Sequence, residues 1–562
     1  MRSEPILFTP AKSLERFVDF FLAPLAIFFS FYTPDFISGF IFSLDEGYHL
    51  SCINDLLSGA VPYRDIYMQH GPLLEYIPYW LMKLFGVHLG VLRGFQLFGN
   101  MLSFLFAFIL LRTVVSNPLL KYSAFYLMLR FPMKIVWDTR WGGIRWIPGF
   151  VGLMLIYLWL RDRKTMYLYV LGLVCGLGLL ISQEIGISIM LSAGVALFFH
   201  ALGRKADEGF VQSLARNGFR ILVGFAVAVI PSYVHLALNQ ALGEYFKITF
   251  IDTLLLMPRE MPYGPPLPPL SRVLRPGVWL EPEAIRVTVY YGIGLAYVGM
   301  AAWALLRLRR KSDYRAISVL CLIAYGAVAL KGAARNVREA QFDAVLPAAL
   351  ISVAMFLQTW LAPGANSEGT HESLPSPDKQ PRKFRFKTLL VLIIVAVPLL
   401  LSGNPYKYFK TRISAFWWEL PPSVFVELRP DIIPRAAGVK VPRTQAEELN
   451  GIVAFIREHT SGDEEIFAFP YEGHVYFLAE RQSASRFNIA LYSAVRAEYM
   501  EEIVRELESN QTRYIIYNPE EYKILDIPNE TRLRPVWDYV VTNYEFLTSY
   551  GDMQILVRAS GK

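Results

Sequence analysis

Long apolar runs recur along most of the chain, and short segments rich in Lys, Arg and Pro separate them. An apolar helix of about 17–25 residues can cross a hydrocarbon layer of about 30 Å. We expect about eleven such spans, at residues 17–42, 90–112, 119–137, 144–161, 166–182, 184–202, 217–241, 285–308, 314–331, 341–361 and 387–403. The pattern predicts a mainly α-helical protein that crosses a membrane many times.

Basic residues mark one side of that membrane, because loops that stay in the cytoplasm retain Lys and Arg. They precede the first span and fill alternate connections after it: Arg2, Lys12, Arg16, Arg112, Lys121, Arg161, Arg163, Lys164, Arg204, Lys205, Arg216, Arg220, Arg307, Arg309, Arg310, Lys311 and Arg315. The linker 362–387 is rich in Gly, Ser and Pro and also basic, so it belongs to the same side. An odd number of spans then puts the N-terminus in the cytoplasm and the C-terminus outside.

The apolar stretch 73–85 cannot be a full crossing under this orientation, since counting it would invert every later loop. It has only about thirteen residues and contains Pro78. That length is typical of an interfacial or re-entrant helix. Residues 43–89 are therefore predicted to form one long outer loop.

Beyond residue 403 the pattern changes to short helical and extended segments. Amphipathic helices are expected at 445–458 and 493–508, and strands at 466–469 and 514–517. This alternation predicts a small α/β domain outside the membrane. We therefore divide the chain into a membrane module, 1–403, and an outer domain, 404–562.

Composition supports this division and excludes several classes of function. Of the 562 residues, 54% are hydrophobic and only 18% charged, against about 25% charged in an average soluble chain. The basic residues that give the chain its net charge of +7 lie between apolar segments, so no nucleic-acid partner is expected. Three cysteines, Cys52, Cys175 and Cys321, are too few for a disulfide framework or a zinc cluster.

The first outer loop opens with two adjacent carboxylates, Asp45 and Glu46. In one interpretation Asp45 is a general base that takes a proton from an acceptor hydroxyl, and Glu46 assists it. The pair could also hold one divalent cation such as Mg²⁺ or Mn²⁺. In the alternative interpretation both residues are a solvated acidic start to a helix.

The remainder of the loop resembles a known pattern. An Asp-Glu pair after the first span is followed by Pro62-Tyr63-Arg64-Asp65 and by Gly71-Pro72-Leu73, which opens a short apolar helix ending at Leu84-Phe85-Gly86. This series resembles the first outer loop of the GT-C superfamily of glycosyltransferases. It is most similar to bacterial relatives of protein O-mannosyltransferases and of the aminoarabinose transferase that modifies lipid A. The similarity covers residues 17 to about 205, and extends weakly to 335–347 and 466–487.

The resemblance implies a GT-C-like enzyme in a bacterial inner membrane, with a periplasmic outer domain. It implies transfer of a sugar, usually with inversion, from a polyprenyl-phosphate donor to an acceptor at the outer face. In that family the loop Asp acts as base or binds the acceptor, and Asp45 occupies its position; the role of the second acid, here Glu46, varies. The acceptor, whether lipid, protein or polysaccharide, stays open.

A phosphate leaving group gains negative charge as the glycosidic bond breaks, so cations are expected opposite the carboxylates. Outer-side candidates for binding the donor phosphate are Arg140, Arg145, Lys331, Arg335 and Arg338. Arginine suits this task because its planar guanidinium binds phosphate oxygens in pairs. Alternatively, the Trp-rich segment around the first two belongs to an interfacial aromatic belt, and Asp343 pairs with one of the last two.

Further candidates for binding the sugar or the acceptor are Tyr63, Asp65, His70, Gln183 and Glu184. Glu184 lies in a tight outer turn, where an ionisable group is costly unless it is used or paired. Many GT-C relatives have a Lys in this turn, and Gln183 stands in its place here. For His70 a structural role is the alternative, and Tyr63 and Asp65 can equally be turn-forming residues.

The outer loop 242–284 contains eight prolines, so we expect it to form neither helix nor sheet. It is either a lid that excludes water from the site or an interfacial spacer. Two other functions remain open at this stage. One is a flippase or transporter of lipid-linked sugars, which would need ionisable residues within its spans, and the other is a ligase or polymerase of lipid-linked glycans.

Overall fold

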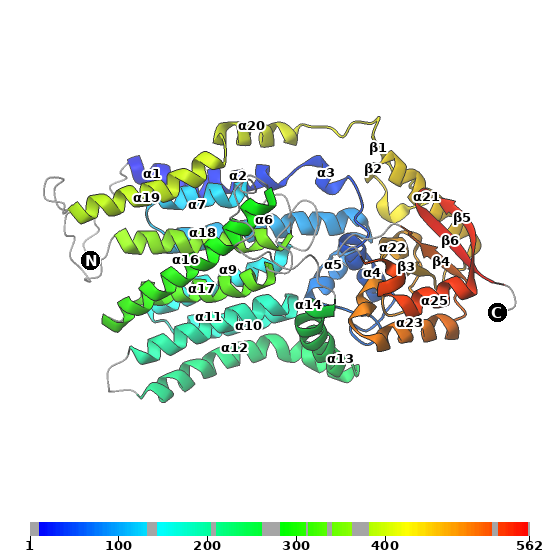
Figure 1. Ribbon diagram of the computed structural model, residues 1–562, viewed down its shortest axis with the longest axis horizontal. Helices are drawn as coiled ribbons and strands as arrows, with labels where there is room; N and C mark the ends of the chain where they lie inside the picture. The colour runs from blue at the N-terminus through cyan, green and yellow to red at the C-terminus, as the bar shows by residue number, and fades with distance from the viewer. Residues whose placement is uncertain are drawn as a thin grey trace.

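The protein consists of a helical bundle with an α/β domain at one end, as the computed structural model shows (Figure 1). It describes residues 10–131, 143–203, 209–260, 282–310, 313–333, 340–361, 382–519 and 527–559. The predicted fold class, a polytopic helical protein with a small C-terminal α/β domain, is confirmed.

The bundle is built from helices that follow the apolar runs of the sequence. They are α1 (Pro10–Phe17), η1 (Val18–Leu22), α2 (Ala23–Phe31), α3 (Pro34–Ile37), α4 (Asp45–Leu57), α5 (Leu73–Phe85), α6 (Leu89–Val114), α7 (Pro118–Arg130), η2 (Gly143–Trp146), α9 (Ile147–Asp162), α10 (Met166–Ile181), α11 (Gln183–Leu202), α12 (Phe210–Leu238), α13 (Leu242–Phe246), η3 (Lys247–Leu256), α14 (Met257–Glu260), α16 (Pro282–Arg310), α17 (Tyr314–Ala333), α18 (Ala340–Leu361), α19 (Arg382–Leu401) and α20 (Pro405–Phe416). Every predicted span falls on one or more of these helices.

Six helices in the described ranges are long and apolar enough to cross a membrane. They are Leu89–Val114, Gly143–Asp162, Gln183–Leu202, Phe210–Leu238, Val287–Arg310 and Tyr314–Gly332, and the pair α19–α20, bent by 43°, would be a seventh. The protein is therefore a multi-pass membrane protein. This number is below the expected eleven because the apolar parts of α10 and α18 are shorter, α7 has only 13 residues, and the first predicted span is divided among α1, η1, α2 and α3.

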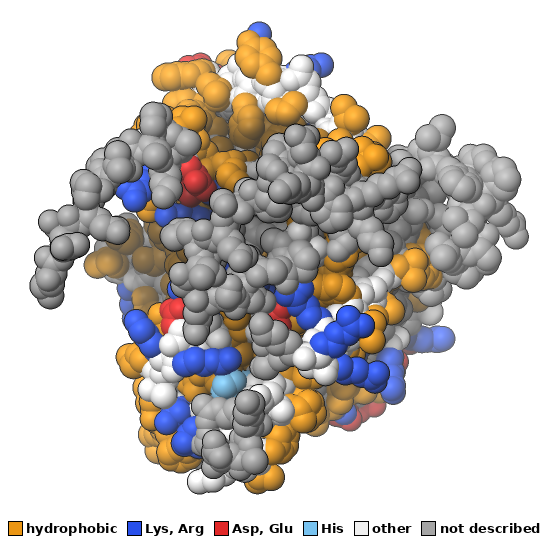
Figure 2. All heavy atoms as spheres, turned by 90° about the vertical axis from the view of Figure 1, so that its left-hand side faces the viewer, with side chains coloured by type: hydrophobic (Ala, Val, Ile, Leu, Met, Phe, Trp, Pro, Cys, Tyr) orange, Lys and Arg blue, Asp and Glu red, His pale blue; other side chains and the backbone are white. Residues whose placement is uncertain are grey.

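The end of the bundle furthest from the α/β domain is rich in positive charge. Figure 2 shows this end, where Lys and Arg side chains are more widespread than Asp and Glu on the surface that is coloured by type. The chain passes from α11 to α12 here (Figure 1). The connection between these two helices is one of those that the charge pattern of the sequence predicts to be cytoplasmic.

The outer loop 43–89 consists of two helices, α4 and α5, which lie between the bundle and the α/β domain (Figure 1). The helix α5 covers residues 73–85 as predicted, and it ends where Gly86 adopts a φ of 102°. That backbone conformation favours glycine, because a side chain would clash there. Trp80, Leu84 and Phe85 are exposed on α5, which agrees with an interfacial position.

The first part of the Pro-rich loop is helical, contrary to the expectation from its proline count. Residues 242–260 form α13, η3 and α14 in sequence. Only Pro258 falls within them, since the other seven prolines follow at 262 and beyond. Residues 261–281 of the loop 242–284, which was predicted to be a lid or a spacer, lie outside the described residues.

The α/β domain contains two sheets. Strands β1 (Phe425–Glu427) and β2 (Lys440–Pro442) form an antiparallel pair. The larger sheet has the order β3-β4-β6-β5, made of β3 (Phe467–Phe469), β4 (Tyr514–Tyr517), β5 (Tyr544–Tyr550) and β6 (Met553–Arg558). The helices of the α/β domain are η5 (Pro434–Ala436), α21 (Arg443–His459), α22 (His474–Ala479), η6 (Ala490–Val495), α23 (Ala497–Ser509), α24 (Asn529–Arg532) and α25 (Arg534–Asn543).

The two predicted helices and two predicted strands of this domain are present, and β4 has the predicted limits. Strand β3 pairs in parallel with β4, and β6 pairs antiparallel with both β4 and β5. The predicted domain boundary at residue 403 falls between α19 and α20. The helix α20 packs on α2, where Phe416 contacts Phe28, Phe29 and Tyr32, and β1 follows it.

The α/β domain is fixed to the loop that carries the acidic pair. Gln445 on α21 exchanges two hydrogen bonds with the backbone of Ile41, at 2.9 and 3.0 Å. Strand β3 leads to α22, which packs beside α4 (Figure 1). At this contact a Cβ atom on Gly47 would lie 2.8 Å from the backbone N of His474, and one on Gly473 would lie 2.8 Å from the Gly47 carbonyl oxygen. Two glycines thus allow the two backbones to touch.

Asp55, further along α4, is buried in the same interface. Its Oδ2 accepts a hydrogen bond of 2.7 Å from Asn488, and burial raises the pKa of Asp55 from 3.8 to about 7, with Asn488 and Asn54 opposing the shift. A carboxyl group whose pKa is higher in the folded protein than in the unfolded chain stabilises the fold below its unfolded pKa, and this stabilisation disappears as the pH rises through the folded pKa.

We therefore expect the wild-type protein to lose thermal stability between about pH 4 and pH 7, by on the order of a few kcal/mol from this group. The variant Asp55→Asn keeps an acceptor for Asn488 but does not titrate, so its melting temperature should fall less over this range. Melting curves in detergent across this pH range measure the effect. The exposed Asp538→Asn is the matched control and should keep the wild-type slope; an equal slope in Asp55→Asn would contradict the assignment.

Candidate functional site

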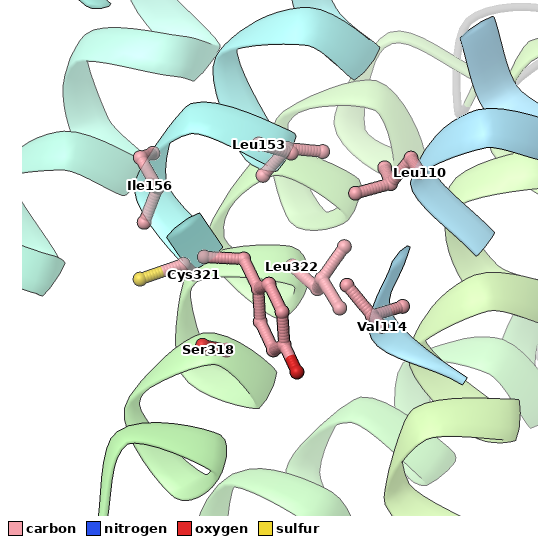
Figure 3. A pocket seen from close by; sticks show the side chains of 8 residues that line it. Leu110, Val114, Leu153, Ile156, Ser318, Cys321 and Leu322 are labelled. Carbon is pink, nitrogen blue, oxygen red and sulfur yellow. The ribbon is translucent and has the colours of Figure 1, made fainter. Parts of the chain in front are cut away.

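The bundle contains a small internal cavity, but it lacks charged groups. Figure 3 shows its lining from α6, α9 and α17, which comprises Leu110, Val114, Leu153, Ile156, Tyr157, Ser318, Cys321 and Leu322. The hydroxyl of Ser318 donates to the Tyr314 carbonyl of its own helix, at 2.8 Å. A site for acid–base or phosphate chemistry must lie elsewhere.

Charged side chains meet at the end of the bundle that lies next to the α/β domain. Asp45 is the first residue of α4, Arg145 lies in η2 and Glu184 in the first turn of α11. Arg145 Nη2 lies 3.5 Å from Glu184 Oε1, and their side chains are 11% and 41% exposed. The guanidinium of Arg145 also acts electrostatically on Asp45 and lies 4.9 Å from the Trp146 ring. Three segments distant in sequence thus bring one cation into contact with Glu184 and within electrostatic range of Asp45.

Asp45 combines partial exposure with a raised pKa. It keeps part of its surface accessible, while burial raises the pKa of its carboxyl from 3.8 to about 6, and His49 and Arg145 oppose this shift. A carboxylate with a pKa near 6 is ionised at neutral pH yet accepts a proton more readily than an ordinary aspartate. Desolvation is the dominant cause of such a shift in enclosed carboxylates.

A buried polar layer lies next to this group. Gln183 donates hydrogen bonds to the carbonyls of Gln69, at 2.8 Å, and Thr249, at 3.3 Å. Tyr63, with a φ of 68°, donates from its hydroxyl to the His70 carbonyl at 2.6 Å. Burial lowers the pKa of His70 well below its usual range, and Arg145 and His49 lower it further. His70 is therefore a neutral imidazole close to Arg145.

Glu46 points away from this cluster, although it is the next residue after Asp45. Its two carboxylate oxygens accept hydrogen bonds from Arg93 Nε, at 2.6 Å, and Nη2, at 2.9 Å, and both side chains are fully buried. Arg93 also donates to the carbonyls of Ile37 and Phe40, at 2.9 and 3.2 Å. Glu46 and Arg93 thus fix the turn that leads into α4.

This arrangement bears on the expected divalent cation. Glu46 engages both carboxylate oxygens with a cation already, so it does not offer them to a metal beside Asp45. Within the described part of the chain, no group of three or more His, Cys, Asp or Glu side chains has an arrangement that could hold a metal ion. The residues present here do not fit a two-carboxylate metal site, and we derive no step from one.

The remaining predicted residues are not all brought together. Asp65 pairs with its neighbour Arg64 at 2.7 Å and accepts from the Val61 backbone at 2.8 Å, which supports the turn-forming interpretation. Lys331 lies exposed in the last turn of α17. Arg140, Arg335 and Arg338 lie outside the described residues.

Sequence reasoning missed three residues of this region: His49, Glu75 and Arg93. His49 follows Asp45 by four positions, which places it on the same face of a helix, so a helical interpretation of 45–57 could have identified it. Glu75 and Arg93 gave no local signal, because their partners lie 26 and 47 positions away in the sequence.

Comparison with known proteins gives a likeness in structure alone. No protein-family model and no curated protein sequence matches the chain. It is similar to ArnT from Cupriavidus metallidurans bound to undecaprenyl phosphate, with a TM-score of 0.48, 10% identity, and coverage of 98% of this chain and 99% of ArnT. It is also similar to the Archaeoglobus fulgidus oligosaccharyltransferase tethered with an acceptor peptide, with a TM-score of 0.49, 15% identity, and coverage of 98% and 75%. Both are GT-C glycosyltransferases, members of the superfamily that the outer-loop motif resembles.

Proposed function

We propose that the protein is a membrane glycosyltransferase that moves a sugar from a polyprenyl-phosphate donor to an acceptor hydroxyl at the outer face of the membrane. The observation that carries this proposal is that Arg145 contacts Glu184 and acts electrostatically on Asp45, at the end of the bundle next to the α/β domain. Displacement of a phosphate from a sugar requires a base whose pKa lies near neutral pH and a cation close to that base.

In the proposed reaction the acceptor hydroxyl loses its proton to Asp45 as its oxygen bonds to the anomeric carbon. The bond between that carbon and the phosphate oxygen breaks, and its electron pair leaves with the polyprenyl phosphate. Arg145 offsets the negative charge that develops on this oxygen. The ion pair with Glu184, at 3.5 Å, orients the guanidinium, whose planar fork can bind phosphate oxygens in pairs.

The α/β domain gives the acceptor a route to this site. It docks on α4, the helix that begins with Asp45, through Gly47 and Gly473, and Gln445 binds the backbone of Ile41 just before that helix. The helix η3 of the outer loop is attached to the same domain, because Asp252 binds Arg496 at 2.7 Å and Tyr499 at 2.5 Å. We propose that these contacts form the rim over which the acceptor enters.

The test uses purified protein in lipid nanodiscs, sugars linked to undecaprenyl phosphate or to undecaprenyl pyrophosphate, and pooled acceptors. Acceptor-dependent release of undecaprenyl phosphate from the monophosphate donor is the expected result. Release from the pyrophosphate donor alone would instead indicate a ligase or polymerase of lipid-linked glycans.

Arg145→Gln should lower kcat/KM by roughly 10²–10³, the usual effect of removing one group that stabilises a developing oxyanion. Arg145→Lys should recover part of the activity, since it keeps the charge but not the planar fork. Arg161→Gln, at the other end of the bundle, removes an arginine that pairs with Asp162 and should leave the rate unchanged. Wild-type activity in a folded Arg145→Gln protein would contradict the proposal.

A further inference from the structure

Behind Asp45, a second charged pair joins the two helices of the outer loop. His49 Nδ1 on α4 lies 2.7 Å from Glu75 Oε1 on α5, and the side chains are only 3% and 1% exposed. His49 lies one helical turn after Asp45, so both side chains project from the same face of α4. The pair therefore connects the site to the interior of the loop.

Among the described residues, His49 is the hydrogen-bond partner of Glu75. The groups that act on Glu75 from α4 and the following loop, Tyr48, Cys52 and Tyr63, are neutral at physiological pH, and burial raises the pKa of each further. The second oxygen of Glu75, Oε2, accepts no hydrogen bond from any described residue. A buried carboxylate is costly without a partner, so the contact at 2.7 Å with His49 stabilises its charge, and a positive imidazolium would do so most strongly.

The charges that face His49 from the other side agree with this state. Asp45 is the anion on its own helix, and it is stabilised in its ionised form by His49 and Arg145. His70, from the loop between α4 and α5, is kept neutral by burial and by the positive charges of Arg145 and His49. With an imidazolium at His49, the charges along this row alternate: Glu75 negative, His49 positive, Asp45 negative and Arg145 positive.

We infer that His49 and Glu75 are a positioning pair: Glu75 keeps His49 protonated and fixes its ring, and the imidazolium keeps Asp45 ionised and ready to take the acceptor proton. The pair does not touch the reacting atoms and exchanges no proton with the substrate. This inference rests on the proposed function, because it assigns the pair to the base of that reaction.

Loss of either member should make Asp45 easier to protonate. Glu75→Gln keeps a hydrogen-bond acceptor for His49 but removes the negative charge, so His49 becomes neutral. His49→Gln removes the positive charge directly. In both variants the acid limb of the pH profile of kcat/KM should move to higher pH by about one unit. Activity should then be about tenfold lower on the acid side of the limb and nearly unchanged on the alkaline side. A merely structural role would lower activity at every pH.

Two controls separate charge from folding. Glu75→Asp restores the negative charge and should return the acid limb toward the wild-type position. Asp55→Asn removes a buried carboxylate from the same helix, next to Asn488 rather than Asp45, and should leave the limb unchanged. If Glu75→Gln does not fold, the comparison of His49→Gln with Glu75→Asp still decides the question.

An infrared titration of the free protein tests the pair without any substrate. With isotopically labelled aspartate, the protonated carboxyl band that is absent from Asp45→Asn reports Asp45 alone. Its midpoint should rise in Glu75→Gln and in His49→Gln. An unchanged midpoint would overturn the inference while the proposed function stands. A raised midpoint with an unshifted activity profile would instead remove Asp45 from the reaction and overturn the proposed function.

Discussion

Asp45→Asn is expected to abolish sugar transfer, with a loss of roughly 10²–10⁴ in kcat, the usual contribution of a general base. Asparagine has nearly the same shape as aspartate but accepts no proton at neutral pH, so the donor can still bind while the acceptor hydroxyl stays protonated. Acceptor-dependent release of polyprenyl phosphate measures the rate. Binding of undecaprenyl phosphate, measured by native mass spectrometry, should change little.

The matched control for this variant is Asp162→Asn, which changes an aspartate at the end of the bundle that we assign to the cytoplasm, where it pairs with Arg161. This variant should transfer sugar at the wild-type rate. A folded Asp45→Asn protein that keeps more than about a tenth of the activity would remove the role of general base from Asp45, because the expected loss is at least about a hundredfold.

Gly47→Val is expected to separate the α/β domain from the helix that carries Asp45. A Cβ atom at this position would lie 2.8 Å from the His474 backbone N, and this neighbour is backbone, which cannot rotate away. Overpacking of this kind costs about 1–3 kcal/mol in a well-packed interior. The domain should therefore dock less tightly, and transfer should fall together with docking.

Limited proteolysis and hydrogen exchange across the connection between α20 and β1 measure this separation. Gly94→Ala provides the matched control, since Gly94 also lies in a helix and a Cβ there meets nothing within 4 Å. It should leave docking and activity unchanged or raise stability slightly. Wild-type protection of the connection in Gly47→Val would show that the close contact is not needed for docking.

The sequence predicted those parts of the fold that local signals determine. The limits of α5 agree because Pro72 and Gly86 bound the apolar stretch on both sides, and β4 agrees because Tyr514–Tyr517 is a short run of β-branched and aromatic residues. The helices at 242–260 were missed because the prolines of the whole loop were counted together. A proline affects the helix only near its own position.

The candidate site could be predicted only in part, because its geometry depends on contacts between distant residues. Asp45, Arg145 and Glu184 were each identified singly, but nothing local showed that they meet. The role of Glu46 was assigned from its neighbour in sequence, whereas its partner is Arg93, on another helix. Likewise, Gly47 is informative only once it faces Gly473 across the domain interface.

Because Glu46 pairs with Arg93, the order of Asp45 and Glu46 in the sequence matters, and not only their total charge. If the two were exchanged, the chain would keep its composition and its isoelectric point. The shorter aspartate would then face a buried guanidinium that it reaches less well, and the longer glutamate would enter the site. The first carboxylate, Asp45, faces the candidate site, and the next, Glu46, anchors the loop through Arg93, so the two positions are not interchangeable.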